Sequence, residues 1–317
     1  MDSIVTLTMN PSLDITVAAD AVRPTDKIRC SRARYDAGGG GINVAKTAHV
    51  LGAPVSAVFP VGGASGDMVT HFVAEAGLPF RRIDIAEPTR ESFTIDEAGT
   101  GLQYRFVLPG RRLTPSEQAA CVDQLRAEAV SAQFVVASGS LPPGVPTDFY
   151  QRIADMCNET GTRFILDTSG AGLQHISGGV SVLKASVREL RECVGRDLAT
   201  ESEQLDAAHE QIGCGRAEAV VVSLGAQGAL LATPTESYRF AAIPMRAVSG
   251  VGAGDAMVAG ITVGLTRGWP LSTSVRFGIA SGAAMLMTPG TAPCTRADTE
   301  RLFEIAEEPV NVAVVCA

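Results

Sequence analysis

The sequence predicts an α/β protein with a mostly parallel sheet sandwiched by helices, together with a small separate β-sheet. The first observation is that short apolar segments, such as residues 134–137, 164–167 and 219–224, alternate with helical segments. Buried strands separated by helices are typical of a parallel sheet that is covered on both faces. The second observation is that glycine-rich and polar residues follow several of these strands, at the sheet edge where such folds bind ligands.

The N-terminal part of the chain is expected to supply one side of a ligand site. Residues 4–9 are β-rich and end at Asn10-Pro11, which predicts a buried strand followed by a loop that carries Ser12 and Asp14. Four consecutive glycines at residues 38–41 precede a helical pattern with Asn43 in its first turn. Because four glycines carry a large entropic cost, they favour a close approach of the backbone to a ligand over a plain linker.

A small sheet is predicted from two alternating segments and a β-prone stretch. Residues 89–95 and 103–107 alternate and are separated by Gly99-Thr100-Gly101, which predicts a hairpin. With residues 12–36, this hairpin would form a sheet that stands apart and serves as a lid. We therefore expect a core of residues 1–11, 37–88 and 110–317, and a lid of residues 12–36 and 89–109.

The other elements follow from apolar periodicity along the chain. A strand is expected at 55–59 and a helix from about 68 to 76. Further helices are expected at 114–130, 148–159, 187–194 and 201–212, and strands at 134–137, 164–167, 181–184 and 219–224. From about residue 307 the chain is expected to form a frayed tail.

A second glycine loop organises the C-terminal part. Residues 247–255 contain Gly250, Gly252 and Gly254 and end at Asp255, which precedes an apolar run at 256–265 that predicts a buried helix. A glycine loop that enters a helix offers unpaired N–H groups and the positive end of the helix dipole to a phosphate. Asp255, beside that anion site, is well placed to take a proton from an attacking hydroxyl. The alternative is an ordinary strand–turn–helix corner in which Asp255 only stabilises the helix N-terminus.

Composition limits the classes of function. The 317 residues include 26 basic and 34 acidic side chains, and a net charge of −8 argues against nucleic acid as the main partner. The length fits one large α/β domain or two ordinary ones. Seven scattered cysteines without a C-x-x-C pair argue against a zinc site or a disulfide framework and favour a reducing cytosol. No long uncharged apolar run or signal sequence is evident, so we expect a soluble cytoplasmic protein that does not bind membranes.

The two glycine motifs resemble the signatures of the ribokinase-like PfkB sugar kinases. The motifs are residues 38–41 with Ile42-Asn43-Val44-Ala45, and Gly252-Ala253-Gly254-Asp255. Within that family, the chain resembles the minor-type ATP-dependent 6-phosphofructokinases at residues 7–14, 27–30, 104–110 and 138–144. The resemblance covers nearly the whole chain and implies a ribokinase-like fold, with a Rossmann-like core and a β lid that also forms a homodimer contact.

The resemblance also implies a role for each residue of the site. Asp255 would be the catalytic base, and Gly252, Ala253 and Gly254 would form the anion hole for the transferred phosphoryl group. The implied sugar-phosphate contacts are Ser12, Asp14, Lys27, Gly39, Gly40, Asn43, Arg90 and Ser138. The implied contacts to ATP and its ions are Lys184, Ser186, Glu189, Ser223, Gly225, Gly228, Ser249 and Val251.

One departure concerns the magnesium site. The family commonly has Lys-Pro-Asn and, after two further residues, Glu, whereas this chain has Lys184-Ala185-Ser186 and Glu189. Glu189 is kept as the expected Mg²⁺ ligand, but Ser186 reaches less far than asparagine, so metal affinity or rate is expected to be lower. The family's monovalent-cation site, built from backbone near Ser249, Val251 and Gly290, is compatible with K⁺, but the side chains around it do not confirm it.

The function that this resemblance implies is ATP-dependent phosphorylation of fructose 6-phosphate to fructose 1,6-bisphosphate. Arg90 with Lys27 favours a substrate that already carries a phosphate over a free sugar or a nucleoside. The alternatives are a kinase of tagatose 6-phosphate or fructose 1-phosphate, and a non-catalytic sugar-phosphate sensor, for which Ser186 is the only support. A dehydrogenase is disfavoured because no dinucleotide fingerprint follows the first strand.

Overall fold

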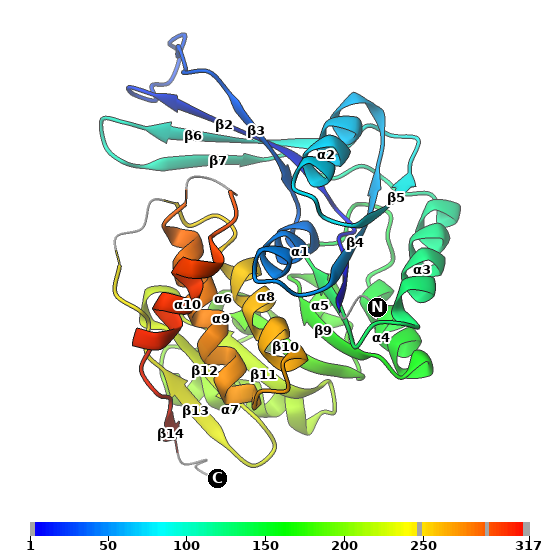
Figure 1. Ribbon diagram of the computed structural model, residues 1–317, viewed down its shortest axis with the longest axis vertical. Coiled ribbons are helices and arrows are strands. Elements are labelled where there is room, and N and C mark those ends of the chain that lie inside the picture. Colours follow the sequence, from blue (N-terminus) through cyan, green and yellow to red (C-terminus); the bar gives the residue numbers. More distant parts are fainter. Residues whose placement is uncertain (1–3, 246–248, 289–291, 313–317) are drawn as a thin grey trace.

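A ten-stranded sheet forms the centre of the molecule (Figure 1). The computed structural model describes residues 4–245, 249–288 and 292–312, and its strand order is β14-β13-β12-β11-β10-β9-β8-β1-β4-β5. Neighbouring strands from β5 to β11 are parallel, and those from β11 to β14 are antiparallel, so the mostly parallel sheet is confirmed. The strands are β1 Ile4–Leu7, β4 Val55–Val61, β5 Phe80–Asp84, β8 Phe134–Ser138, β9 Arg163–Asp167, β10 Val180–Ser186, β11 Ala217–Ser223, β12 Ala229–Ala232, β13 Ser237–Phe240 and β14 Val310–Val312.

Helices cover both faces of this sheet because successive strand residues point into two different apolar cores. In β1, Ile4 belongs to a core that also contains residues of α1, α2, α8 and α9, whereas Val5 belongs to a core that contains residues of α3, α4, α6 and α7. The outer helix α10 packs against α9. The helices are α1 Gly40–Val50, α2 Gly63–Glu75, α3 Pro115–Ala129, α4 Phe149–Thr160, α5 Ala171–Gln174, α6 Val187–Val194, α7 Glu201–Gly213, α8 Ala253–Thr266, α9 Leu271–Leu286 and α10 Arg296–Ile305. None of the helices in the described part of the chain is long and apolar enough to span a membrane.

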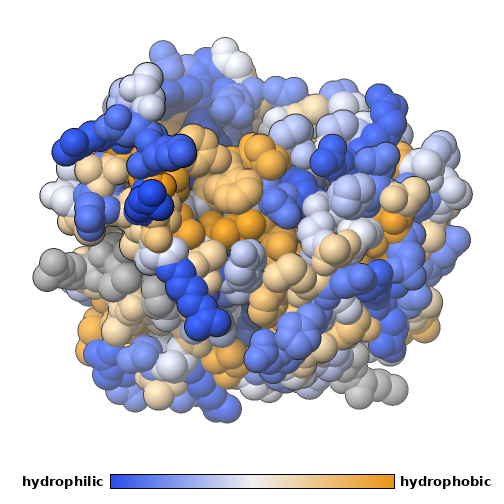
Figure 2. Space-filling model, turned by 90° about the horizontal axis from the view of Figure 1, so that it is seen from above, coloured by the Kyte–Doolittle hydropathy of each residue, from blue (hydrophilic) through white to orange (hydrophobic). Residues whose placement is uncertain are grey.

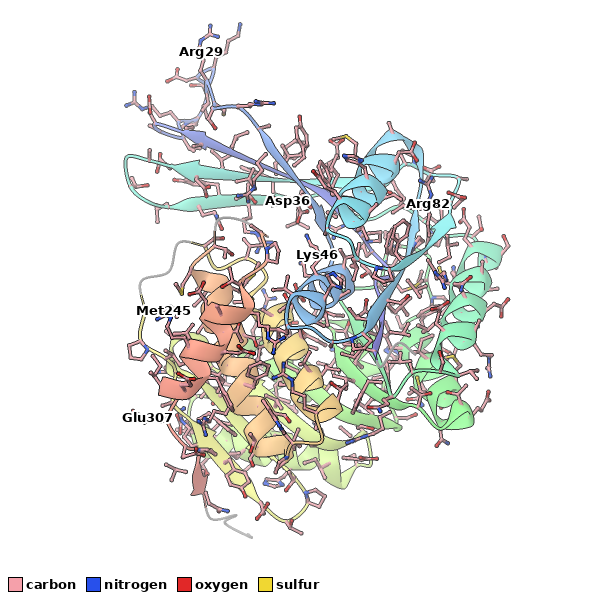
Figure 3. All side chains as sticks on the ribbon, viewed as in Figure 1. Arg29, Asp36, Lys46, Arg82, Met245 and Glu307 are labelled. Carbon is pink, nitrogen blue, oxygen red and sulfur yellow. The ribbon has the colours of Figure 1, made fainter. Side chains whose placement is uncertain are left out.

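A separate four-stranded sheet projects from the core (Figure 1). Its order is β3-β2-β6-β7, and the strands are β2 Ser12–Ala19, β3 Arg34–Gly38, β6 Arg90–Glu97 and β7 Gln103–Val107. The expected hairpin is therefore confirmed as β6 and β7. Figure 2 views the molecule from above, the side on which this sheet projects, and shows apolar residues gathered in a hollow surrounded by hydrophilic ones. Arg29, in the connection between β2 and β3, lies at the outer tip of the sheet (Figure 3).

Several local predictions were wrong. The expected frayed tail contains β14, which pairs with β13 and thereby satisfies part of an otherwise open sheet edge. Ser12 and Asp14 lie within β2 and not in a loop, because the strand continues from the core directly into the small sheet. The helix expected from residue 68 begins at Gly63, where close packing of Gly62 and Gly66 against residues 85–89 outweighs the poor helix propensity of glycine. Strands β5, β12 and β13 and helices α5, α9 and α10 were not predicted.

Candidate active site

The second glycine loop leads into the N-terminus of α8. Gly252 occupies the N-cap position with φ of 78°, a left-handed conformation that favours glycine. No side chain caps this end of the helix, and Asp255 is the acidic residue of its first turn. The backbone N–H groups of the first turn are therefore left for another acceptor, which favours an anion. Ala247 and Val248 of the predicted loop lie outside the described residues.

Asp255 is held by residues from two other elements. The Nδ2 atom of Asn43, on α1, donates to its Oδ2 at 3.0 Å, and the Oγ atom of Ser138, at the end of β8, donates to its Oδ1 at 3.0 Å. Burial and the negative charge of Asp167 raise the pKa of Asp255 to about 6, although the two hydrogen bonds and Lys184 act against this shift. A carboxylate with a pKa near neutrality is suited to general-base chemistry.

Asp255 opens into a cavity of about 260 Å³ between the core and the small sheet. Arg90 of β6 pairs in register with Ser12, and Ser92 pairs with Asp14, so four polar side chains share one face of the small sheet. The Oγ atom of Ser12 donates to Asp14 at 2.6 Å, and burial raises the pKa of Asp14. The cavity is lined by Ser12, Asp14, Gly39, Gly40, Asn43, Arg90, Ser92, Phe93, Thr94, Arg105, Val107, Val251, Gly252 and Asp255.

Two glycines of the first motif make room for polar side chains of the candidate site. A Cβ atom on Gly38 would overlap the carboxylate of Asp14, and one on Gly40 would overlap the Oγ atom of Ser138. The glycine run therefore lets the backbone approach two side chains of the candidate site, while its expected approach to a ligand stays a prediction. Gly39, at φ of 117°, forms the N-cap of α1 and also lines the cavity.

Arg90 is fixed by backbone carbonyls at the entrance of the small sheet. Its guanidinium donates to the carbonyl oxygen of Asn10 at 3.0 Å and to that of Leu108 at 3.2 Å. Its Nε has no hydrogen-bond partner among the residues that the structure describes. Burial lowers the pKa of Arg90, although the charge of Asp14 opposes that shift. A guanidinium that is held in place beside the polar side chains of Ser12 and Asp14 is suited to bind an anionic group of a ligand.

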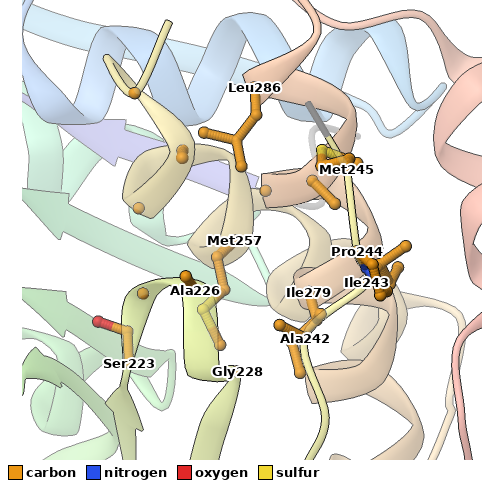
Figure 4. Close-up of a pocket in the computed structure, with 16 residues that line it drawn as sticks. Ser223, Ala226, Gly228, Ala242, Ile243, Pro244, Met245, Met257, Ile279 and Leu286 are labelled. Atoms are coloured by element: carbon orange, nitrogen blue, oxygen red, sulfur yellow. The ribbon is translucent and has the colours of Figure 1, made fainter. Parts of the chain in front are cut away.

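A second, more apolar cavity of about 700 Å³ lies on the other side of the glycine loop (Figure 4). Gly250, Ala253 and Gly254 line this cavity, whereas Val251, Gly252 and Asp255 line the first one. The helix N-terminus thus lies between a polar and an apolar cavity, an arrangement that suits a nucleotide whose phosphates cross the loop. The other residues that line the apolar cavity are Ser223, Gly225, Ala226, Gly228, Ala242, Ile243, Pro244, Met245, Met257, Ile279, Gly282, Ala283 and Leu286.

A buried ion pair lies next to the loop. The Nζ atom of Lys184 is 3.0 Å from Oδ2 of Asp167, and register places these residues side by side on β10 and β9. A Cβ atom on Gly254 would lie 3.0 Å from the same Nζ, so Lys184 also contacts the start of α8. Burial acts to lower the pKa of Lys184, but the charges of Asp167 and Glu189 outweigh it and the pKa is raised. The raised pKa favours the cationic form of Lys184 beside the expected anion hole.

Ser186 and Glu189 form a capping box at the start of α6. The backbone N–H and the Oγ–H of Ser186 each donate to Oε2 of Glu189 at 2.7 Å, and the Glu189 N–H donates back to Oγ at 3.3 Å. Serine is among the preferred N-cap residues, which gives a structural reason for Ser186. In the described residues no cluster of three or more His, Cys, Asp or Glu side chains could hold a metal ion. Mg²⁺ is commonly held by one or two carboxylates together with substrate phosphates, so Glu189 remains suitable.

Some of the residues that were predicted for the site line neither the polar nor the apolar cavity. Lys27 is exposed, two residues from the tip residue Arg29, and is not among the residues that line the polar cavity. Ser249 accepts a hydrogen bond from the Val251 N–H at 3.3 Å and lines a third cavity beside the β6–β7 hairpin. Gly290, expected to help bind a monovalent cation, lies outside the described residues.

The sequence analysis missed residues on both sides of the loop. Ser92, Thr94 and Arg105 of the small sheet line the polar cavity, and the period-2 pattern that begins at Arg90 would have identified the first two. Asp167 was predicted only as the last residue of a strand. Its place at the carboxyl end of β9, where such sheets bind ligands, could have identified it as a candidate site residue. The apolar residues of the larger cavity, such as Met257 and Ile279, carry no sequence signal that distinguishes them from core residues.

Comparisons with known proteins agree with this fold. A family model described as "pfkB family carbohydrate kinase" matches residues 7–298. The chain is 66% identical over 309 residues to the ATP-dependent 6-phosphofructokinase isozyme 2 of Mycobacterium tuberculosis, covering 98% of this chain and 91% of that protein. The crystal structure of Escherichia coli phosphofructokinase-2 in complex with potassium has a TM-score of 0.91 and 35% identity, over 96% of this chain and 99% of the other. The same enzyme in complex with fructose-6-phosphate has a TM-score of 0.90 and 34% identity over the same shares.

Proposed function

The chain belongs to the pfkB family of carbohydrate kinases, and from this premise we propose that it transfers the γ-phosphoryl group of ATP to fructose 6-phosphate, which gives fructose 1,6-bisphosphate and ADP. The observation that carries the proposal is the placement of Asp255 between the polar cavity and the uncapped N-terminus of α8. Relatives named as ATP-dependent 6-phosphofructokinases over almost the whole chain support the choice of ATP and of a phosphorylated ketose.

Asp255 is proposed as the general base. It would accept the proton of the sugar's primary hydroxyl while that oxygen bonds to the γ-phosphorus and the bond from this phosphorus to the β-γ bridging oxygen of ATP breaks. Asn43 and Ser138 orient the carboxylate, because each donates a hydrogen bond to a different oxygen of it. The backbone N–H groups of Gly252, Ala253 and Gly254 would stabilise the negative charge on the transferred group.

The sugar phosphate is proposed to occupy the polar cavity. Asp14, Ser12 and Asn43 would bind sugar hydroxyls, and the Oδ1 atom of Asn43 has no hydrogen-bond partner within the described part of the chain. The backbone of Gly39 and Gly40 would contact the sugar, and Arg90 would hold its existing phosphate. Ser138 remains a proposed further contact, although it donates to Asp255 and is not among the residues that line this cavity. Lys27 remains a proposed phosphate contact that would require the tip of the small sheet to approach this cavity.

ATP is proposed to place its adenosine in the apolar cavity and its phosphates across the loop. Ser223, Gly225 and Gly228 line that cavity, and Lys184 would neutralise phosphate charge. Magnesium is proposed to be held by Glu189, with Ser186 beside it and the phosphates of ATP as further ligands. When bound, it would neutralise charge on the phosphates. A K⁺ site near Ser249 and Val251 is proposed on the basis of the potassium complex of the Escherichia coli relative.

A homodimer through the small sheet is proposed from its exposed apolar face. Register pairs Phe93 with Phe106 and with Ile15, and Ile15 with Tyr35, so these residues lie on the face opposite to Asp14 and Ser92. Phe93, Phe106 and Tyr35 are 37%, 49% and 40% exposed, and contiguous exposed apolar side chains mark interaction surfaces. Sedimentation analysis of the wild type and of Phe106→Glu tests this proposal, and a wild-type monomer would refute it.

Two further predictions remain proposals. They are the assignment of residues 12–36 and 89–109 to a lid, and a cytoplasmic location.

Turnover on a panel of substrates tests the proposed function. ADP release with Mg-ATP would be compared for fructose 6-phosphate, tagatose 6-phosphate, fructose 1-phosphate, free fructose and ribose. The proposal expects the highest kcat/KM for fructose 6-phosphate. A preference for another phosphorylated ketose would keep the mechanism and change the substrate. Binding of sugar phosphate without turnover of any compound would favour the sensor.

A further inference from the structure

The backbone of Gly139, directly after Ser138, is held at both of its polar atoms. Its N–H donates to the carbonyl oxygen of Asp167 at 2.9 Å, at the end of the neighbouring strand β9. Its carbonyl oxygen accepts two hydrogen bonds, from Oη of Tyr150 at 2.7 Å and from Oγ1 of Thr168 at 3.0 Å. Three hydrogen bonds therefore fix the residue that follows Ser138, and the mechanism above uses neither of the two hydroxyls.

The conformation of Gly139 explains why it needs these contacts. Its φ is 108°, which side chains other than glycine rarely adopt, and a Cβ atom on it would lie 3.6 Å from the backbone nitrogen of Gly40. The chain thus leaves β8 in an unusual conformation and comes close to the first glycine motif. Glycine adopts more backbone conformations than any other residue, so hydrogen bonds are needed to select the one that directs Ser138 to Asp255.

Both hydroxyls belong to side chains that are shielded from solvent. Tyr150, in the first turn of α4, is fully buried, and Thr168, directly after β9, is 3% exposed. Helix α4 packs against β9 and against the short helix α5, which are all green in Figure 1. A Cβ atom on Gly172 of α5 would lie 3.2 Å from the Tyr150 ring and 3.3 Å from Oγ1 of Thr168, so α5 covers the pair. Loss of either hydroxyl would therefore remove a buried partner of the Gly139 carbonyl.

We propose that Tyr150 and Thr168 are positioning residues for phosphoryl transfer, because their hydroxyls hold the backbone of Gly139 in place. The fixed backbone keeps Oγ of the preceding Ser138 at 3.0 Å from Oδ1 of Asp255. Neither Tyr150 nor Thr168 is among the residues that line the polar or the apolar cavity, so they act through Ser138 and not by contact with a substrate. The inference rests on the proposed function for the role of Asp255 as the base, but not for the hydrogen bonds that hold it.

Displacement of Ser138 would change the ionisation of Asp255 as well as its orientation. The hydrogen bond from Ser138 favours the ionised carboxylate, so its loss should raise the pKa of Asp255 further. The acidic limb of kcat/KM should then move to higher pH. Burial and the negative charge of Asp167 raise the pKa of Tyr150, so its hydroxyl keeps its proton where Asp255 titrates.

Two conservative variants test the inference. Tyr150→Phe and Thr168→Val each remove one hydroxyl and keep the shape of the side chain. The ¹⁵N–¹H signals of the Asn43 side-chain amide, which donates to Asp255, report the ionisation of that carboxylate without any substrate. The charged groups around Asp255 are the same in all variants, and they are Asp167, Lys184, Lys46, Asp14, Arg90 and Arg105.

We expect the Asn43 amide titration to move up by about half a pH unit in each variant, and kcat to fall by roughly three- to tenfold. The acidic limb of kcat/KM should move in the same direction. KM for ATP should not change, because Gly139 is not among the residues that line the apolar cavity. A titration and a kcat that both stay at the wild-type values in the folded variants would overturn the inference.

Ser138→Ala shows whether the effect passes through Ser138. This variant removes the hydrogen bond itself, so it should move the Asn43 titration at least as far as Tyr150→Phe does. Tyr150→Phe added to Ser138→Ala should cause no further move, since no hydroxyl is left at residue 138 to be displaced. A further move of the same size as in the single variant would overturn the inference.

Thr162→Val is the matched control. Thr162 directly precedes β9, at the end opposite to Thr168, and its buried Oγ1 donates to the carbonyl oxygen of Ala129 at 3.0 Å. The control should lose stability in thermal melts much as Thr168→Val does, with the Asn43 titration and kcat unchanged. An equal shift of the titration in the control would mean that the shift follows stability alone, which would overturn the inference.

Failure of the proposed function can be distinguished from failure of this inference. A wild type that turns over no sugar phosphate would refute the proposed function. The substrate-free titrations would still decide whether Tyr150 and Thr168 position Ser138 against Asp255.

Discussion

The side-chain amide nitrogen of Asn43 lies 3.0 Å from Oδ2 of Asp255, although the two residues are 212 positions apart in the chain. Each lies in the first turn of a helix that follows a glycine motif, Asn43 on α1 and Asp255 on α8, and the two helices pack against each other. The contact joins the first glycine motif to the second. The orientation and the ionisation of the proposed base therefore depend on a residue of the other motif.

This contact predicts a pH dependence. The kcat/KM of the wild type should rise with pH through an apparent pKa of about 6, because only ionised Asp255 accepts the hydroxyl proton. The hydrogen bond from Asn43 favours the ionised form, so Asn43→Ala should move this acidic limb to higher pH. A pH–rate profile of both enzymes checks the sign. An acidic limb that stays in place would show that Asn43 does not control Asp255.

Arg90 should control the affinity for the phosphorylated sugar. We expect Arg90→Ala to raise KM for fructose 6-phosphate by roughly 10- to 100-fold, because charge-assisted hydrogen bonds to the phosphate are lost. KM for ATP should change much less, since Arg90 lines the polar cavity and not the apolar one. Initial-rate kinetics with each substrate varied in turn measures both constants. An unchanged KM for the sugar phosphate would remove Arg90 from the site.

Gly40 should be required for the position of Ser138. A Cβ atom at residue 40 would overlap Oγ of Ser138, so Gly40→Ala should displace the hydroxyl that donates to Asp255 and lower kcat by about tenfold or more. Gly213→Ala is a suitable control, because a Cβ atom there meets no atom within 4 Å. Steady-state kinetics and thermal melts of the two variants check this. Equal activity of both variants would contradict the proposed role of the glycine run.

Ser186 should contribute to stability as well as to the metal site. Ser186→Ala removes a capping box and should cost about 1 kcal/mol, as should Thr200→Ala in the equivalent box of α7 away from the site. Ser186→Asn keeps a favourable cap and, by restoring the family residue, should raise the affinity for Mg²⁺. Denaturant unfolding and the Mg²⁺ dependence of kcat measure these effects. If Ser186→Asn gains neither rate nor Mg²⁺ affinity, residue 186 does not limit phosphoryl transfer.

Much of the fold was predictable because its signals are local. The alternation of apolar strands and helices gave the mostly parallel sheet, and the Gly-Thr-Gly break between β6 and β7 gave the hairpin. Strand β14 was missed because it has only three residues, 310–312, and because its pairing partner β13 lies in a distant part of the chain. Helix α9 is a run of small and apolar residues whose burial against α8 could not be distinguished from that of a strand.

The site was predictable where glycine and polar residues depart from core patterns. Asp255, Asn43 and Ser138 were all predicted to belong to the site, and Asn43 and Ser138 each donate a hydrogen bond to Asp255. Met257, which lines the apolar cavity, was missed because an apolar residue in a buried helix has the same pattern whether it packs on protein or on a ligand.

The measurement that tests the central claim most directly compares Asp255→Asn with the wild type in turnover, binding and stability. We expect kcat with Mg-ATP and fructose 6-phosphate to fall by about 100-fold or more, with the affinity for sugar phosphate, measured by calorimetry, largely unchanged. Because burial raises the pKa of Asp255 above its value in the unfolded chain, the ionised carboxylate destabilises the fold at neutral pH, so the neutral asparagine should raise the melting temperature. A folded Asp255→Asn variant that keeps its turnover within tenfold of the wild type would contradict the assignment of Asp255 as the base.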